Sequence, residues 1–363
     1  MSGTFTTVRS VGGLLPSDLL VRVLSGDATL AGLKPAEYHL GGGESVREAA
    51  NRAWSYLTGT WAAFTAAREK LAEGDPAVGL TRERWLSLLF RELGYGRLPQ
   101  TPAGGLAAGE KQFAISHVWE RTPIHLLGWG VDLDRRTPGV AGAAARAPHA
   151  LVQEYLNRSE ESLWAIVSNG RVLRILRDSS SLAGQSFLEF DLEAMFEGEV
   201  FSDFVALFMV AHQSRVEVAP DGPASDCWLE KWRTAAVESG TRALGELRVG
   251  VREAIEALGT GFLHHPDNGG LVHRLNSGEL KLEDYHRALL RLVYRLLFLF
   301  VAEDRGALLA PDADEVARER YARYFSTSRL RRLATRRRGT RHGDQWESLR
   351  LVIGALGRDG GRP

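Results

Sequence analysis

A short Asn169-Gly170 step between two apolar runs constrains this chain more than any other feature of its sequence. The flanking runs are Leu163 to Ser168 and Arg171 to Leu176. Apolar segments of this length joined by Asn-Gly are typical of a β-hairpin, and the pair favours a type I′ turn, in which both central residues take positive φ. The chain should therefore contain an antiparallel pair of strands near its centre.

Further short apolar runs around this hairpin predict more strands. Gln112 to Ser116, Ile124 to Leu133 and Phe187 to Phe190 are each bounded by turn residues. Between them, Pro148 to Asn157 indicates a helix with proline at its first position. We expect a mixed sheet of about four or five strands within residues 80–200.

Helical periodicity dominates both sides of this central region. Towards the amino end, apolar residues recur at helical spacing over 44–72 and 81–94. The segment Leu289 to Ala302 is strongly apolar but is interrupted by Arg291 and Arg295, so it predicts a buried helix and not a membrane span. The helical segments towards the carboxyl end are 230–258, 282–303, 314–325 and 346–356.

These patterns predict an α+β chain with three parts and a tail. We expect a helical lead-in over 1–75, a mixed α/β domain over 76–215, a mostly helical connector over 216–357 and a tail over 358–363. The tail is rich in glycine and arginine and is linker-like, which suggests that a further domain normally follows.

Charge and cysteine content exclude several classes of protein. Lys plus Arg and Asp plus Glu both number 45, so no net basic field favours nucleic acid. The single Cys227 excludes an internal disulfide and a cysteine-cluster zinc site, and nothing around it suggests a catalytic nucleophile. The polar start, Met1 to Ser10, is unlike a secretory signal. We therefore expect a cytoplasmic protein that does not bind a membrane.

Several segments, taken in order over about 110–360, carry a resemblance: Gly128 to Arg136, Pro148 to Asn157, Leu163 to Arg174, Phe190 to Phe196 and Tyr294 to Gly306. This order is similar to the front portion of adenine-specific DNA methyltransferases of the Eco57I type, which belong to type IIG restriction–modification. It also resembles the PglX-like proteins of BREX and the methylase of DISARM in phage defence. The resemblance implies a degenerate PD-(D/E)XK-like nuclease fold and a helical connector, before a methyltransferase domain that uses S-adenosylmethionine.

Nuclease chemistry of that fold needs two carboxylates to hold Mg²⁺ and a lysine near the attacking water. The candidate acids are Asp132, Asp134 and Glu154. The lysine's position is taken by Asp134 or by Arg136, depending on which acid is aligned, and neither residue does the work of a lysine. We expect a degenerate scaffold in place of a working metal site. An active Mg²⁺-dependent DNA endonuclease is the alternative.

Methyltransferase chemistry is missing from the sequence. N6-adenine methylation needs an Asp/Asn/Ser-Pro-Pro-aromatic loop that grips the flipped base. No Pro-Pro dipeptide occurs, and no glycine-rich turn follows a suitable strand. We expect a truncated, non-catalytic part of such an enzyme with no cofactor of its own. A stand-alone subunit that works with a separate methylase is a further alternative.

One strongly basic segment is the main candidate for contact with a partner. Residues 329–341 contain seven arginines and no acid. Clustered arginines bind DNA phosphates in a salt-dependent way without reading the base sequence. The alternative is a solvated helix face that pairs with the acids of 312–319. We expect double-stranded DNA and a methyltransferase domain or subunit as partners. The DNA-binding candidates are Arg331, Arg332, Arg336, Arg337 and Arg338.

Overall fold

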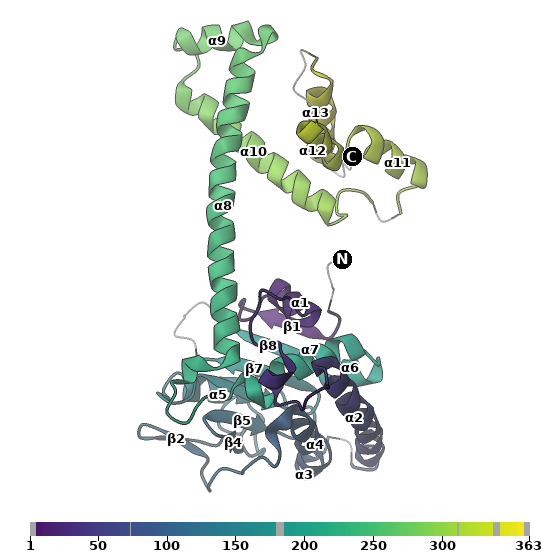
Figure 1. Cartoon of the computed structure of the whole chain (residues 1–363), viewed down its shortest axis with the longest axis vertical. Helices are drawn as coiled ribbons and strands as arrows, with labels where there is room; N and C mark the ends of the chain where they lie inside the picture. The colour runs from purple at the N-terminus through teal and green to yellow at the C-terminus, as the bar shows by residue number, and fades with distance from the viewer. Residues whose placement is uncertain (1–4, 73, 179–184, 311, 337–341, 359–363) are drawn as a thin grey trace. The chain divides into compact units, whose positions relative to one another are not determined.

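A computed structural model describes residues 5–72, 74–178, 185–310, 312–336 and 342–358 (Figure 1). The chain divides into two compact units, Met1–Gly240 (unit 1) and Thr241–Pro363 (unit 2). The division falls inside the long helix α8 (Trp228–His264). The boundaries predicted at 75 and 215 stay predictions, and the first helices of the chain share one core with the sheet.

Unit 1 is built on a six-stranded mixed sheet with the strand order β1, β8, β7, β6, β5, β4. Strands β5 and β6 are parallel, and all other neighbours are antiparallel. Strands β2 and β3 form a separate antiparallel ribbon. The bounds are β1 (Val8–Val11), β2 (Leu106–Ala108), β3 (Lys111–Phe113), β4 (His117–Trp119), β5 (Thr122–Leu126), β6 (Trp164–Ser168), β7 (Val172–Arg177) and β8 (Phe187–Asp191).

The helix α5 (Pro148–Leu156) lies between the two parallel strands in the chain, with Pro148 in its first turn as predicted. A parallel pair needs a crossover connection of this kind, because a tight turn can join only antiparallel strands. The mixed sheet and the flanking helices confirm the predicted α+β class. Likeness of this sheet to the PD-(D/E)XK fold stays a prediction.

Helices cover both faces of the sheet, and the alternation along β6 shows how. Trp164 and Ile166 join the large core that includes residues of α1, α2, α4 and α7, whereas Ala165 and Val167 pack in the smaller core with α5. Successive residues of a strand point to opposite faces, so both faces of a buried strand must be apolar. The remaining helical elements of unit 1 are α1 (Ser17–Ser25), η1 (Pro35–Tyr38), α2 (Val46–Arg68), α3 (Val78–Thr81), η2 (Arg82–Leu86), α4 (Ser87–Phe90), η3 (Arg91–Tyr95), α6 (Leu192–Glu197), α7 (Phe201–Ala211), η4 (Gln213–Arg215) and η5 (Ala224–Asp226).

The predicted hairpin is confirmed as β6 and β7, but its predicted turn type is wrong. Gly170 has φ +82°, whereas Asn169 is not among the residues with positive φ. The Asn169 side chain instead accepts hydrogen bonds from the backbone amides of Arg171 at 3.0 Å and Val172 at 2.9 Å. This local side-chain cap holds a wider loop, since the last paired residues are Ser168 and Leu173.

The strand predicted from Ile124 to Leu133 is shorter than expected. It ends at Leu126. The Leu127 amide still donates to the Ser168 carbonyl at 2.8 Å, but the Trp129 amide donates to the Pro76 carbonyl at 2.5 Å and so leaves the sheet. Residues 131–136, predicted as the strand that bears the nuclease acids, form a loop. Their acids therefore do not alternate across a sheet.

The first strand, β1, was not predicted. It pairs antiparallel with β8, about 180 residues later in the chain, with Val8 opposite Phe190. The buried carboxylate of Asp203, in α7, accepts hydrogen bonds from the backbone amides of Thr6 at 3.0 Å and Thr7 at 2.8 Å. The amino-terminal segment is thus fastened to the sheet edge and to α7.

Unit 2 is helical in the part that the structure describes. The segment predicted as a buried helix is a helix, but it is not buried all round: Leu289, Val293 and Leu299 are buried, whereas Tyr294 and Phe298 are 64% and 63% exposed. No helix in the described ranges is long and apolar enough to cross a membrane. The elements are the end of α8, η6 (Pro266–Asn268), α9 (Gly269–Asn276), α10 (Leu282–Asp304), α11 (Glu315–Tyr324), α12 (Thr327–Arg336) and α13 (Asp344–Leu356).

Candidate functional site

The predicted metal ligand Asp134 is the counterion of a buried arginine. Its two carboxylate oxygens accept from the two terminal nitrogens of Arg174 at 2.7 and 2.8 Å. Arg174 lies on β7, is 6% exposed, and also donates to Glu189 at 2.5 Å. These hydrogen bonds from Arg174 lower the pKa of the Asp134 carboxyl. A bidentate pair of this kind fixes the guanidinium in place.

The predicted ligands Asp132 and Glu154 also have local roles. Asp132 is exposed and accepts from the amides of Asp134 at 2.8 Å and Arg135 at 3.1 Å, so it caps a turn. Glu154, in α5, pairs with cations. Within the described ranges, no group of three or more His, Cys, Asp or Glu side chains is placed to hold a metal ion.

The described part of the basic segment forms helix α12 in unit 2. Arg329 donates to Gln345 at 2.9 Å, and Arg331 donates to Asp304 at 2.5 Å. Arg332 and Arg336 are exposed and have no ion-pair partner among the residues that the structure describes. The described arginines of α12 form no ion pair with the acids of 312–319, the alternative raised by the sequence. Arg337 and Arg338 lie outside the described residues.

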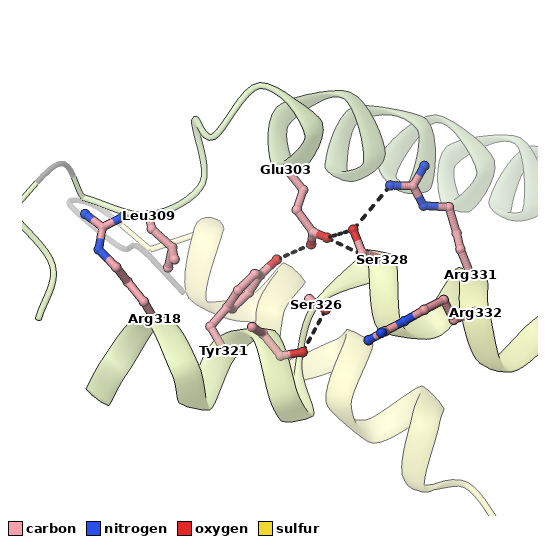
Figure 2. Close-up of a pocket in the computed structure, with 9 residues that line it drawn as sticks. Glu303, Leu309, Arg318, Tyr321, Ser326, Ser328, Arg331 and Arg332 are labelled. Atoms are coloured by element: carbon pink, nitrogen blue, oxygen red, sulfur yellow. Dashed lines mark hydrogen bonds between the residues drawn. The ribbon is translucent and has the colours of Figure 1, made fainter. Parts of the chain in front are cut away.

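The start of α12 is held by a residue that sequence reasoning missed. Glu303, near the end of α10, accepts from the amides of Thr327 and Ser328, each at 2.7 Å. It also accepts from the hydroxyls of Ser328 and Tyr321, each at 2.6 Å (Figure 2). The first amides of a helix lack partners within it, so an outside carboxylate satisfies them. The hydroxyl residues at 326–328 were the available signal for a helix start.

Electrostatics agree with this role. Burial alone would raise the pKa of Glu303, but the hydrogen bonds from Ser328, Tyr321 and Thr327 lower it to about 2. Burial and the bond to Glu303 raise the pKa of Tyr321. The carboxylate is therefore charged, and the phenol neutral, throughout the neutral range.

An open cleft of about 670 Å³ is lined in part by Glu303, Tyr321 and Ser328. Figure 2 shows Arg318 on one side of Tyr321, with Arg331 and Arg332 on the other. Arg318 donates to two backbone carbonyls, those of Ala310 and Ala313. Glu303 and Asp304, which pairs with Arg331, offset part of the charge of the three guanidinium groups, and the net positive charge that remains suits an anion. The remaining lining residues are Leu309, Ala322 and Ser326.

Comparison with known proteins found no matching family model, no similar curated protein and no similar solved structure.

Proposed function

We propose that this chain is a non-catalytic module that contacts duplex DNA through the phosphate backbone, using α12 of unit 2. The observation that carries the proposal is that helix α12 is anchored while two of its arginines remain exposed. Glu303 anchors its start, while Arg332 and Arg336 stay exposed and unpaired within the described residues. Unpaired guanidinium groups on an anchored helix are suited to bind phosphates with salt-dependent affinity.

The resemblance supplies the wider setting of the proposal. We infer that the module belongs to a cytoplasmic adenine-specific methyltransferase system of restriction–modification or phage defence, where it holds a methylase domain or subunit on DNA. The acids of the nuclease-like region support a scaffold role, because Asp134 is held by Arg174 and Asp132 caps a turn.

Titration of a fluorescent duplex over a range of salt concentrations tests the DNA contact. Replacing both Arg332 and Arg336 by Gln should weaken binding at low salt about tenfold or more and reduce the salt slope by roughly one to two. Arg350 is the matched control: it is 68% exposed and pairs with Glu347 on α13. Absence of DNA binding, or an equal loss in Arg350→Gln, contradicts the proposal.

The methyltransferase setting has its own test. The purified chain should transfer no methyl group from S-adenosylmethionine to adenine, and it should form a stable complex with a co-expressed N6-adenine methylase in light scattering. Methylation by the chain alone refutes the non-catalytic role. So does Mg²⁺-dependent cleavage of plasmid that disappears in Asp132→Ala.

A further inference from the structure

A second cationic cluster lies in unit 1 around Glu154 of α5. The Lys111 ammonium, at the start of β3, is 2.6 Å from Oε1 of Glu154, and Nε of Arg158 is 3.2 Å from the same oxygen. A guanidinium nitrogen of Arg146, in the loop before α5, contacts Oε2. A strand, a loop and a helix thus bring three cations to one carboxylate, which leaves an excess of two positive charges.

These cations retain donors that Glu154 does not use. An ammonium has three N–H donors and a guanidinium has five, whereas one carboxylate accepts only a few hydrogen bonds. The side chains of Lys111, Arg146 and Arg158 remain 42%, 46% and 54% exposed. Their remaining donors can therefore reach a molecule in solution.

The crowding of like charges affects the pKa of Lys111. Burial, and then the charges of Arg146 and Arg158, lower the pKa of the Lys111 ammonium. Mutual repulsion of this kind costs free energy that a second anion would offset. Arg171, on the same unit, provides the contrast: it is 50% exposed and pairs one-to-one with Glu193 at 2.6 Å.

We propose that Lys111, Arg146 and Arg158 form a binding site for a backbone phosphate of DNA, with Glu154 as the positioning residue that gathers them. The site reverses the role predicted for Glu154, from cation ligand to organiser of an anion site. A phosphodiester offers acceptor oxygens to several converging donors, which fits the unused N–H groups. The inference rests on the proposed function, since it adds a second DNA contact on unit 1.

The experiment compares the salt slopes of duplex binding. The Arg146→Gln/Arg158→Gln double variant should lose about one to two units of slope and bind about tenfold more weakly at low salt. Arg171→Gln should leave both quantities unchanged. Arg146→Lys/Arg158→Lys keeps the charges and should retain most of the slope. Circular dichroism checks that each variant is folded. If the double glutamine variant does not fold, the double lysine variant is compared with the wild type instead.

Glu154→Gln separates an anion site from a simple structural ion-pair network. Glu154→Gln raises the local charge by one unit but removes the carboxylate that gathers the three cations, so duplex binding at low salt should weaken. Binding as tight as in the wild type, or tighter, in a folded Glu154→Gln variant would show that the carboxylate does not position these cations, and it overturns the inference. An unchanged slope in the double glutamine variant overturns it as well.

Titration with inorganic phosphate tests whether the site binds a phosphate of the DNA backbone or free phosphate. Calorimetry should detect no saturable binding of phosphate at millimolar concentration. Saturable binding that disappears in the double glutamine variant, with an unchanged DNA slope, assigns the site to free phosphate instead. If the wild-type chain binds no DNA, the proposed function fails. If only the Arg332 and Arg336 variants weaken binding, this inference alone fails.

Discussion

Two buried arginines of unit 1 differ from two exposed arginines of unit 2 in what their N–H donors contact. In unit 1, Arg174 and Arg215 are buried, and both direct their guanidinium donors to acceptors within the fold. Arg215 donates to the Gly32 carbonyl at 2.5 Å and lies over the Tyr38 ring, 3.8 Å from its centroid. In unit 2, Arg332 and Arg336 are exposed. Burial and partners, more than the number of arginines, separate structural cations from those available to a ligand.

The two units also differ in how much of their apolar surface is buried. Both faces of the unit 1 sheet carry a buried cluster, whereas the buried cluster of unit 2 has five described residues. Large apolar side chains such as Tyr294, Phe298 and Leu351 remain exposed in unit 2. We therefore expect unit 1 to dominate the free energy of unfolding. Eight of the nine tryptophans lie in unit 1, and Trp346 is the ninth, so fluorescence reports mainly on unit 1.

The largest difference should appear in the pH dependence of the unfolding free energy. Burial, aided by the charge of Arg82, lowers the pKa of His117 and His125 to about 4, and burial near Arg174 does the same for His149. The unfolded chain binds more protons than the folded chain between about pH 6.5 and 4, so unit 1 should lose several kcal/mol of stability as the pH falls through that window.

Urea denaturation followed by tryptophan fluorescence at pH 7 and pH 5 measures this loss. His125→Gln should make the remaining loss smaller, because that position no longer takes up a proton on unfolding. Equal stability at both pH values would show that these histidines are not buried in the neutral form.

The next effect concerns the buried arginine. Arg174→Met removes the counterion that Asp134 shares with the 13% exposed Glu189, and Glu189 then keeps only the exposed Arg9, so the variant should lose about 3 kcal/mol of stability. Arg171→Met, which removes an exposed one-to-one pair, should cost less than about 1 kcal/mol. Urea denaturation measures both variants. Equal losses would remove the distinction between buried and exposed arginines.

A smaller effect is expected at the start of α12. Glu303→Gln removes the charge that accepts from two helix amides, and it should destabilise this end of the helix by about 1–3 kcal/mol. Because a lower opening free energy speeds amide exchange, hydrogen exchange of residues 327–336 should become roughly tenfold faster or more. Asp304→Asn, which removes only the exposed pair with Arg331, is the control. Similar exchange in both variants would contradict the anchoring role.

The smallest effect is the sharpest test of the comparison. Replacement of Arg332 and Arg336 by Gln should change the free energy of unfolding by less than about 0.5 kcal/mol, because neither side chain has a partner within the described residues. A loss as large as that of Arg174→Met would mean that these side chains support the fold and are not free for a ligand.

The sequence pattern predicted those elements that form because of residues close to them in the chain. The Asn169-Gly170 hairpin, the helix opened by Pro148 and the helical segments of unit 2 all follow from neighbouring residues. The β1–β8 pairing depends on contacts across the whole unit, which periodicity does not report. The turn at Asn169 differs from the predicted type because the Asn169 side chain accepts from the amides of Arg171 and Val172 and so holds a wider loop.

The candidate site was predicted only as a set of residue types. Clustered arginines at 329–341 pointed to an anion, but the anchor at Glu303 lies in a different helix and has no sequence signature of its own. The acids Asp134 and Glu154 were chosen by alignment to a nuclease pattern. Their partners, Arg174 and Lys111, come from strands distant in sequence, so only the fold shows that these acids face cations.

The pairing of β1 with β8 has a consequence for how the protein forms. Strand β1 can dock only after β8 and Asp203 have been made, so the first residues synthesised complete the sheet last. Until then, the outer edge of β8 offers unpaired amides and carbonyls to any other extended chain. A shortened form that lacks the first eleven residues would keep that edge open permanently, and we expect it to aggregate during expression.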